Sequence, residues 1–162
     1  MIIFGIDPGL SGAIAVFINN KISNVFEIPV MSEGKKNKRQ LNSAHLVKLL
    51  KDNLIDGREA SVVVEQVNAM PGQGVTSMFN FGQTFGAIKG ICAALNLPIF
   101  FVRPSKWKKH FNLINAQKDS SRTKAIEMYP SLSEELSRKK DVNKADAILI
   151  ARYFFETTVS NQ

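Results

Sequence analysis

The sequence predicts an α/β protein with a mixed five-stranded sheet and helices on both of its faces. Three apolar, strand-like segments, residues 2–7, 13–18 and 22–28, follow one another closely along the chain. The Asn19-Asn20 pair favours a hairpin turn between the second and third segments, because asparagine tolerates positive φ. Helix-like and strand-like segments then alternate. This order is typical of three antiparallel strands continued by parallel ones.

The first half of the chain supports this order element by element. Alternation over residues 2–7 places the even-numbered residues on one face of a strand and the odd-numbered ones, ending in Asp7, on the other. Residues 34–39, GKKNKR, predict a basic loop. Apolar residues at helical spacing predict a helix from Ser43 to Ile55, with Ser43 as its N-cap and Gly57 beyond its end.

The second half supplies two more strands and the remaining helices. The helix predicted over 75–95 carries Gly82, Gly86 and Gly90 on one face, so we expect it to pack closely against the sheet or another helix. The other predicted elements are strands at SVVVEQV (61–67) and LPIFFV (97–102), and helices over 105–112, 120–128 and 143–156.

Length and composition favour one domain over residues 1–162, because the chain has 162 residues, 44% of them hydrophobic. We expect no membrane span, since no apolar run reaches the roughly 18 residues that a span needs. The N-terminus does not resemble a signal peptide. Cys92 is the only cysteine, which excludes an intrachain disulfide and favours a reducing compartment. These features together predict a cytoplasmic protein.

The chain is basic, with a net charge of +7 and a pI near 9.6. Its basic residues gather between positions 103 and 124, where the only acid is Asp119; they are Arg103, Lys106, Lys108, Lys109, Lys118, Arg122 and Lys124. Such a cluster indicates a surface for phosphate backbones. A solvated, solubilising face is the alternative. Trp107 within the cluster favours a binding surface.

Three acids are candidates for a shared site. Asp7 and Glu65 each end a predicted strand, and Asp146 lies at the start of the last helix. Parallel neighbouring strands would bring the first two together at the sheet edge where α/β proteins bind ligands. Taken singly, each acid has a structural explanation, as a turn former, a strand-end charge or a partner of the helix dipole. Together they would repel one another unless a cation such as Mg²⁺ lay between them.

A fourth ligand to such a cation remains open between two residues. Asn143 lies on the same side of the predicted helix as Asp146, whereas Asp141 could join only from a loop or cap. The histidines are not candidates, since His45 and His110 fit an amphipathic helix and the basic cluster. A carboxylate metal site beside a basic surface favours metal-assisted cleavage of phosphodiesters.

Four motifs resemble the RuvC-type Holliday junction resolvases of the RNase H-like superfamily, particularly their phage-borne members. The motifs are GIDPGLSG (5–12), VVVEQV (62–67), GQTFG (82–86) and KKDVNKADAILIA (139–151), and they span nearly the whole chain. The resemblance implies an RNase H-like fold, a homodimer acting in recombination and repair, and a Mg²⁺ or Mn²⁺ site. It also implies host cytoplasm, if the chain is phage-encoded.

The resemblance assigns roles to particular residues. Asp7, Glu65 and Asp146 fall on the acidic positions of the family, and Lys118 matches a lysine near the scissile phosphate. Lys106 or Lys108 lies near a second family lysine. The family usually has an acid or histidine where this chain has Asn143, and an aromatic wedge after the glutamate, where Met70 is the apolar substitute. The predicted DNA-binding set is Lys106, Lys108, Lys109, Lys118, Arg122, Lys124 and Met70.

The leading hypothesis is a magnesium-dependent endonuclease that resolves four-way junctions, and also other branched DNA, by paired nicks. Asp7, Glu65, Asp146 and either Asn143 or Asp141 would hold two ions, while Lys118 would stabilise charge on the phosphate. One alternative is a non-catalytic protein that binds branched DNA with the same fold. Another is an actin-like ATPase, which the DPG motif alone favours, although such enzymes need two such domains.

Overall fold

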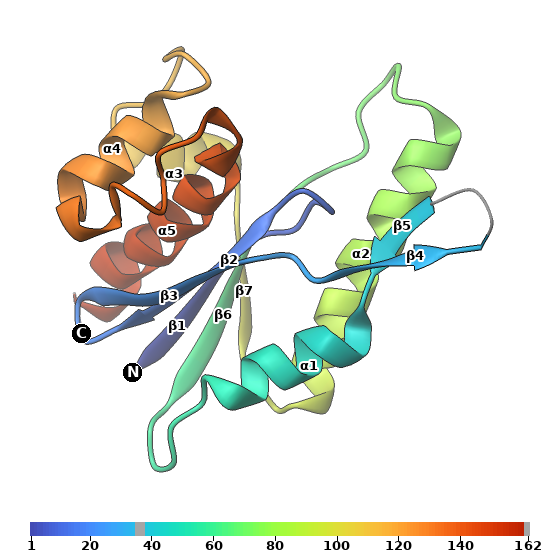
Figure 1. Cartoon of the computed structure of the whole chain (residues 1–162), viewed down its shortest axis with the longest axis horizontal. Helices are drawn as coiled ribbons and strands as arrows, with labels where there is room; N and C mark the ends of the chain where they lie inside the picture. Colours follow the sequence, from blue (N-terminus) through green and yellow to red (C-terminus); the bar gives the residue numbers. More distant parts are fainter. Residues whose placement is uncertain (35–37, 161–162) are drawn as a thin grey trace.

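A central five-stranded sheet organises the molecule, whose computed structural model describes residues 1–34 and 38–160. Its strand order is β3-β2-β1-β6-β7 (Figure 1). The strands are β1 (Ile2–Asp7), β2 (Ala13–Ile18), β3 (Lys21–Glu27), β6 (Ala60–Glu65) and β7 (Ile99–Val102). β1, β2 and β3 pair antiparallel, whereas β6 is parallel to β1 and β7 is parallel to β6. The predicted mixed sheet is confirmed.

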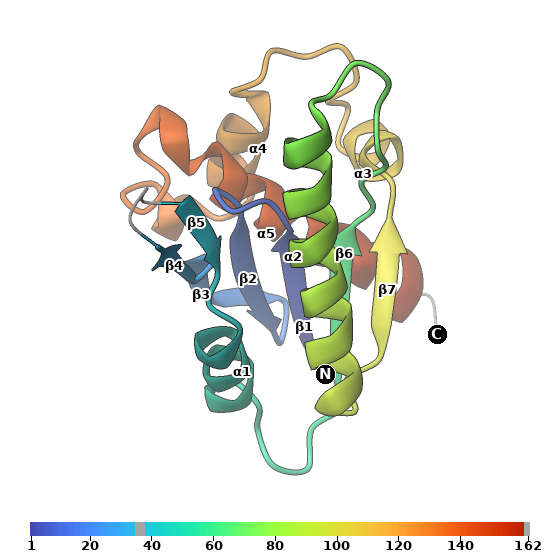
Figure 2. The ribbon, with the colours of Figure 1, turned by 90° about the vertical axis from the view of Figure 1, so that its right-hand side faces the viewer.

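Helices cover both faces of this sheet (Figure 2). α1 (Ser43–Asp52) and α2 (Val75–Ala94) lie on one face. On the other face lie α3 (Pro104–His110), α4 (Ser120–Met128) and α5 (Val142–Phe154). Short helical turns complete this side at Pro130–Leu132, Lys139–Asp141 and Phe155–Val159. In the described part of the chain, no helix combines the length and the apolar character needed to cross a membrane.

The alternation within β1 divides the core in two, as the sequence predicts. Phe4 and Ile6 pack with residues of α1 and α2, such as Leu46 and Ile88. Ile3 packs with residues of α5, such as Ile148. The strand is therefore buried on both faces, because each face supplies one of the two hydrophobic cores.

Several predicted boundaries move by a few residues. The hairpin turn at Asn19 and Asn20 is confirmed, since their φ angles are 50° and 64°. The N-cap of α1 is Asn42 rather than Ser43, because the Asn42 side chain accepts a hydrogen bond from the His45 amide at 3.0 Å. α1 also ends at Asp52, before the predicted Ile55.

A second sheet stands where the sequence predicts a basic loop. β4 (Val30–Glu33) and β5 (Lys38–Leu41) form a two-stranded antiparallel hairpin beside α2 (Figure 1). The prediction of a loop is wrong for Lys38 and Arg39, which belong to β5; the middle of the predicted loop, 35–37, lies outside the described residues. Cross-strand pairing with β4 outweighs the low strand propensity of this basic stretch.

The glycine face of α2 does not pack as predicted. A Cβ placed on Gly82, Gly86 or Gly90 would meet nothing within 4 Å in the described structure. The close approach occurs instead at Gly5 of β1, where a Cβ would collide with the Ala147 carbonyl and lie 2.7 Å from the Ala151 nitrogen. β1 and α5 therefore touch backbone to backbone at this position.

Candidate active site

The topology brings Asp7, Glu65 and Asp146 to one edge of the sheet. In the parallel β1–β6 pair, Ile6 lies opposite Val64, so the next residue of each strand, Asp7 and Glu65, lies at the same carboxyl edge. Asp146 reaches this edge from the first turns of α5, which packs on β1. The parallel pairing of β1 and β6, on which the expected meeting of Asp7 and Glu65 depends, is present.

The three carboxyl groups lie near enough to one another for the charge of one to raise the pKa of another. Burial, then the charges of Glu65 and Asp146, raise the pKa of Asp7 to about 7. Burial also raises the pKa of Glu65, with a further rise from Asp146 and an opposing effect of the Trp107 hydrogen bond. Because like charges in a buried place disfavour ionisation, this edge holds more negative charge than the protein alone stabilises.

Asp146 is the least satisfied of the three acids. Burial raises its pKa, which the Ser121 hydroxyl, Lys108 and Lys118 oppose. Its Oδ1 atom is nevertheless buried without a hydrogen-bond partner among the described residues. A buried carboxylate oxygen without a donor costs free energy, so this atom is one that a bound cation would satisfy.

Trp107 is part of this site and not of an exposed binding surface, which corrects the interpretation drawn from the sequence. Its side chain is fully buried, and its indole N–H donates to Glu65 Oε1 at 2.9 Å. The apolar ring packs in the core on the α5 side of the sheet. Trp107 therefore orients Glu65. Its position among lysines in the sequence gives no sign of this role.

The residues at this edge fit a hard cation by chemistry. The donors are carboxylate oxygens, the ligands that Mg²⁺ prefers, and one of them has no hydrogen-bond partner. Within residues 1–34 and 38–160, however, no group of three or more His, Cys, Asp or Glu side chains is arranged to hold a metal ion. The carboxylates therefore affect one another's pKa, but they are not close enough together to form a complete metal-binding cluster.

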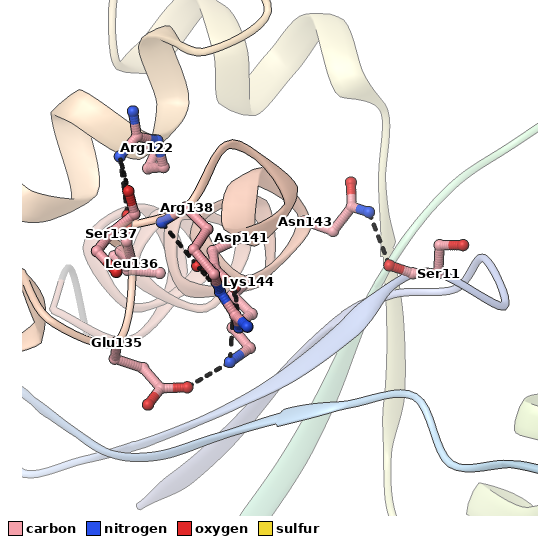
Figure 3. A network of polar contacts seen from close by, with 9 residues as sticks. All are labelled: Ser11, Arg122, Glu135, Leu136, Ser137, Arg138, Asp141, Asn143 and Lys144. Atoms are coloured by element: carbon pink, nitrogen blue, oxygen red, sulfur yellow. Dashed lines mark hydrogen bonds and ion pairs between the residues drawn. The ribbon is translucent and has the colours of Figure 1, made fainter.

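The two candidates for a fourth ligand differ in their surroundings (Figure 3). The Asn143 amide nitrogen donates to the Ser11 carbonyl at 2.7 Å, which ties α5 to the β1–β2 turn. Its Oδ1 accepts no hydrogen bond from the described residues. The Asp141 carboxylate instead forms ion pairs with the Arg138 guanidinium at 2.9 Å and with the Lys144 ammonium at 3.9 Å. The pKa of Asp141 is lowered, mainly by Arg138. Its carboxylate is thus neutralised within the protein, apart from the three acids.

The residues of the predicted DNA-binding set fall into three groups: those close to the carboxylates, those that are exposed, and those that are paired within the protein. Lys108 lowers the pKa of all three site acids, and Lys118 that of Asp146, so both lie close to the carboxylates. Lys106 and Lys109 are exposed, and Met70, on the loop after β6, is 60% exposed.

The third group, Arg122 and Lys124, is paired within the protein. Arg122 donates from two nitrogens to Asp119, at 2.8 and 2.7 Å. A third nitrogen donates to the carbonyls of Leu136 and Ser137 (Figure 3). Lys124 pairs with Glu127 at 3.3 Å. The predicted role of Arg122 in DNA binding conflicts with these contacts, because they occupy most of its guanidinium donors.

The fold is similar to that of solved RuvC-type resolvases, with helices on both faces of a mixed five-stranded sheet. Among solved structures, Thermus thermophilus RuvC matches with a TM-score of 0.55 at 18% identity over 96% of each chain. The same protein in complex with a Holliday junction substrate matches with a TM-score of 0.53 at 17% identity, over 98% of this chain and 97% of that one.

A viral protein shares the fold to the same degree. The fowlpox virus Holliday junction resolvase matches with a TM-score of 0.53 at 17% identity, over 97% of this chain and 99% of that chain. Neither a protein-family model nor a curated protein sequence matches this chain. The likeness is therefore one of backbone architecture along the whole length, at an identity that does not carry residue roles.

Proposed function

We propose that residues 1–162 act as one nuclease domain that cuts four-way DNA junctions, and related branched DNA, with the help of divalent cations. The observation that carries this proposal is the convergence of Asp7, Glu65 and Asp146, buried and mutually repelling, beside Lys108 and Lys118. The fold shared with two junction resolvases supports the choice of substrate.

Asp7, Glu65 and Asp146 would hold the cation, with the free Oδ1 of Asn143 as a neutral fourth ligand. A bound Mg²⁺ or Mn²⁺ pair supplies activation of water and stabilisation of the departing oxygen. Trp107 orients Glu65 through its indole N–H. Lys118, which borders Asp146, would stabilise negative charge on the phosphate.

The protein would act as a homodimer, because paired nicks in two strands need two copies of one site. The exposed face of α2 supports this. Val75 is 80% and Phe79 65% exposed, and the open glycines Gly82, Gly86 and Gly90 let another helix approach closely. Exposed apolar side chains beside open glycines are typical of a protein contact surface, and a second α2 would bury them.

Cleavage and binding are tested with purified protein on labelled four-way, three-way and linear DNA, with Mg²⁺, with Mn²⁺ and with chelator. We expect paired cuts in the four-way junction, only with a divalent ion, and binding in chelator. Asp7→Asn and Glu65→Gln should bind and not cut, whereas the exposed control Asp56→Asn should do both. Equal cutting of linear DNA would contradict the proposal.

A non-catalytic protein that binds branched DNA is the second candidate. It is favoured by the hydrogen bond that the Asn143 amide nitrogen donates to the Ser11 carbonyl and by the open arrangement of the acids among the described residues. Junction binding without cleavage in either metal ion would select it over the nuclease.

The role of Lys118 is separated from simple phosphate contact by comparing two variants. Lys118→Ala should lower the single-turnover rate on the order of 10²-fold, with little loss of affinity. Lys106→Ala, at an exposed position outside the acidic site, should lower affinity and leave the rate of the bound complex intact. Equal losses of binding with unchanged rates would remove Lys118 from the site.

The dimer is tested by light scattering on the eluting protein. Gly86→Arg should convert a dimer into a monomer, because the new side chain would occupy the space that a second helix needs. Ala44→Arg, on the exposed side of α1, is the control and should remain dimeric. A wild-type protein that is monomeric at all concentrations would contradict the proposal.

A further inference from the structure

A second feature, a hollow that we call the hairpin pocket, lies beside the candidate active site. It has a volume of about 740 Å³ and is bounded by the β1–β2 turn, the β4–β5 hairpin, residues 117–119 and residues 139–143. The hairpin, absent from the sequence-based prediction, thus forms one of its walls through Val30 and Arg39.

The hairpin pocket adjoins the acidic site through two shared residues. Lys118 lines the pocket and also lies close enough to Asp146 to lower its pKa. Asn143 lines it too, and its amide holds the Ser11 carbonyl of the pocket's turn. A strand whose phosphate lay at Asp146 would therefore meet this pocket with an adjacent nucleotide.

The lining combines basic and apolar side chains. The basic residues are Arg39, Lys118, Lys139 and Lys140, and the apolar ones are Leu10, Ile28, Val30 and Val142. Two carboxylates also line it, but each has a basic neighbour: Asp119 pairs with Arg122, and Glu27 helps to raise the pKa of Arg138. The net charge of the lining is positive, which favours an anionic group, and its apolar side chains favour a flat apolar group in the same ligand.

We propose that the hairpin pocket receives one unpaired nucleotide of the strand being cut, next to the scissile phosphate. Its base would rest on the apolar side chains, and its phosphate would contact Arg39 and the lysines. The size agrees, since pockets of roughly 300–1,000 Å³ enclose single small molecules and a base pair within a duplex is not free to enter. This inference rests on the proposed nuclease function and adds a requirement for local unpairing.

Arg39 would have the most specific part in this contact. Its Nη2 donates to the Ser11 hydroxyl at a long 3.4 Å, which holds the hairpin side chain over the β1–β2 turn. A guanidinium carries five N–H donors, so the others remain for a phosphate. Arginine suits this position because its planar fork matches two phosphate oxygens.

The inference is tested by the fluorescence of 2-aminopurine, which brightens when the base leaves the stack. The probe is placed at successive positions through the exchange point of a four-way junction, and full-length protein is added in chelator, where no cutting occurs. We expect a rise at one position beside the cut that Mg²⁺ later reveals. Val30→Trp, which fills the pocket, should abolish the rise; Arg39→Ala and Lys140→Ala should reduce it.

Matched controls separate the pocket from general effects. Ile55→Trp adds the same side chain at a site of similar exposure, 42% against 37% for Val30, and Arg58→Ala removes an exposed arginine outside the pocket; both should keep the rise. A bound junction with no rise at any position, or an undiminished rise in all three pocket variants, would overturn the inference. Failure to bind the junction would overturn the proposed function itself.

Discussion

Asp141 and Asp146 lie near the same end of α5, yet their surroundings are opposite. Asp141 is 1% exposed and is neutralised by Arg138 and Lys144, so its pKa is lowered. Asp146 is also largely shielded, but its pKa is raised and one of its oxygens has no partner. Burial alone therefore does not distinguish the two carboxylates; the difference is that Arg138 forms an ion pair with Asp141, whereas no described residue donates a hydrogen bond to Asp146 Oδ1.

The sharpest way to break this comparison is Asp146→Asn. We expect cleavage to be lost entirely, while the free energy of unfolding in chelator stays the same or rises, because an unfavourable buried charge is removed. Single-turnover cleavage and urea unfolding provide the two measurements. A destabilised protein that still cuts would show that Asp146 is structural.

The matched change, Asp141→Asn, should act in the opposite sense. The change removes the charge that holds Arg138, although Arg138 is half exposed and Lys144 keeps Glu135 as a partner. We therefore expect a loss of about 2 kcal/mol in the free energy of unfolding, the cost of hydrogen bonds to a charged group. Cleavage by the folded fraction should persist. Loss of cutting without loss of stability would make Asp141 the fourth metal ligand.

Trp107→Phe sharpens the comparison for Glu65. Without the indole donor, we expect cleavage to fall by about 10-fold and its pH profile to move upward, because the hydrogen bond opposes the rise in the pKa of Glu65. Phe111→Leu, in the same core, controls for packing loss and should not move the profile. Equal profiles for all three proteins would assign Trp107 to packing alone.

The raised pKa of Asp7 predicts a pH-dependent stability in chelator. With a pKa of about 7 when folded against 3.8 as the ordinary value, the folded protein holds a proton that the unfolded chain has released. Its contribution to the free energy of unfolding should therefore fall as pH rises between those values. Urea unfolding across this range should show a smaller fall in Asp7→Asn; an identical fall would contradict the assignment.

The smallest expected effect concerns the basic residues outside the site. If exposed Lys106 contacts a phosphate, Lys106→Ala should flatten the plot of log affinity against log salt by roughly one unit. Arg122→Ala should leave that slope unchanged and lower stability instead, since its guanidinium is held by Asp119 and two carbonyls. Equal changes of slope would return Arg122 to the DNA-binding set.

The sequence predicts the sheet well because its signals are local. Alternation in residues 2–7, the paired asparagines and the helical stripe of α5 each lie within one element. The placement of Asp7 and Glu65 at one edge follows from strand direction alone, so it could also be predicted.

What could not be predicted depends on contacts between distant segments. Trp107 stands among lysines in the sequence, and only the packing of α3 turns its indole toward Glu65. The partners of Arg122 and Asp141 arise from the turns that precede α5. Periodicity predicts that the α2 glycines share one helix face, but it does not reveal whether another element packs on that face.

The contact at Gly5 sets a mechanical rule for the acidic site. Because β1 touches α5 there through backbone atoms of Ala147 and Ala151, the spacing between the strand that ends in Asp7 and the helix that carries Asp146 has no side chain to absorb a change. A single methyl group at residue 5 would push α5 away from β1 and so increase the distance between Asp7 and Asp146. Gly5, which has no side chain, thus sets the distance between these two acids.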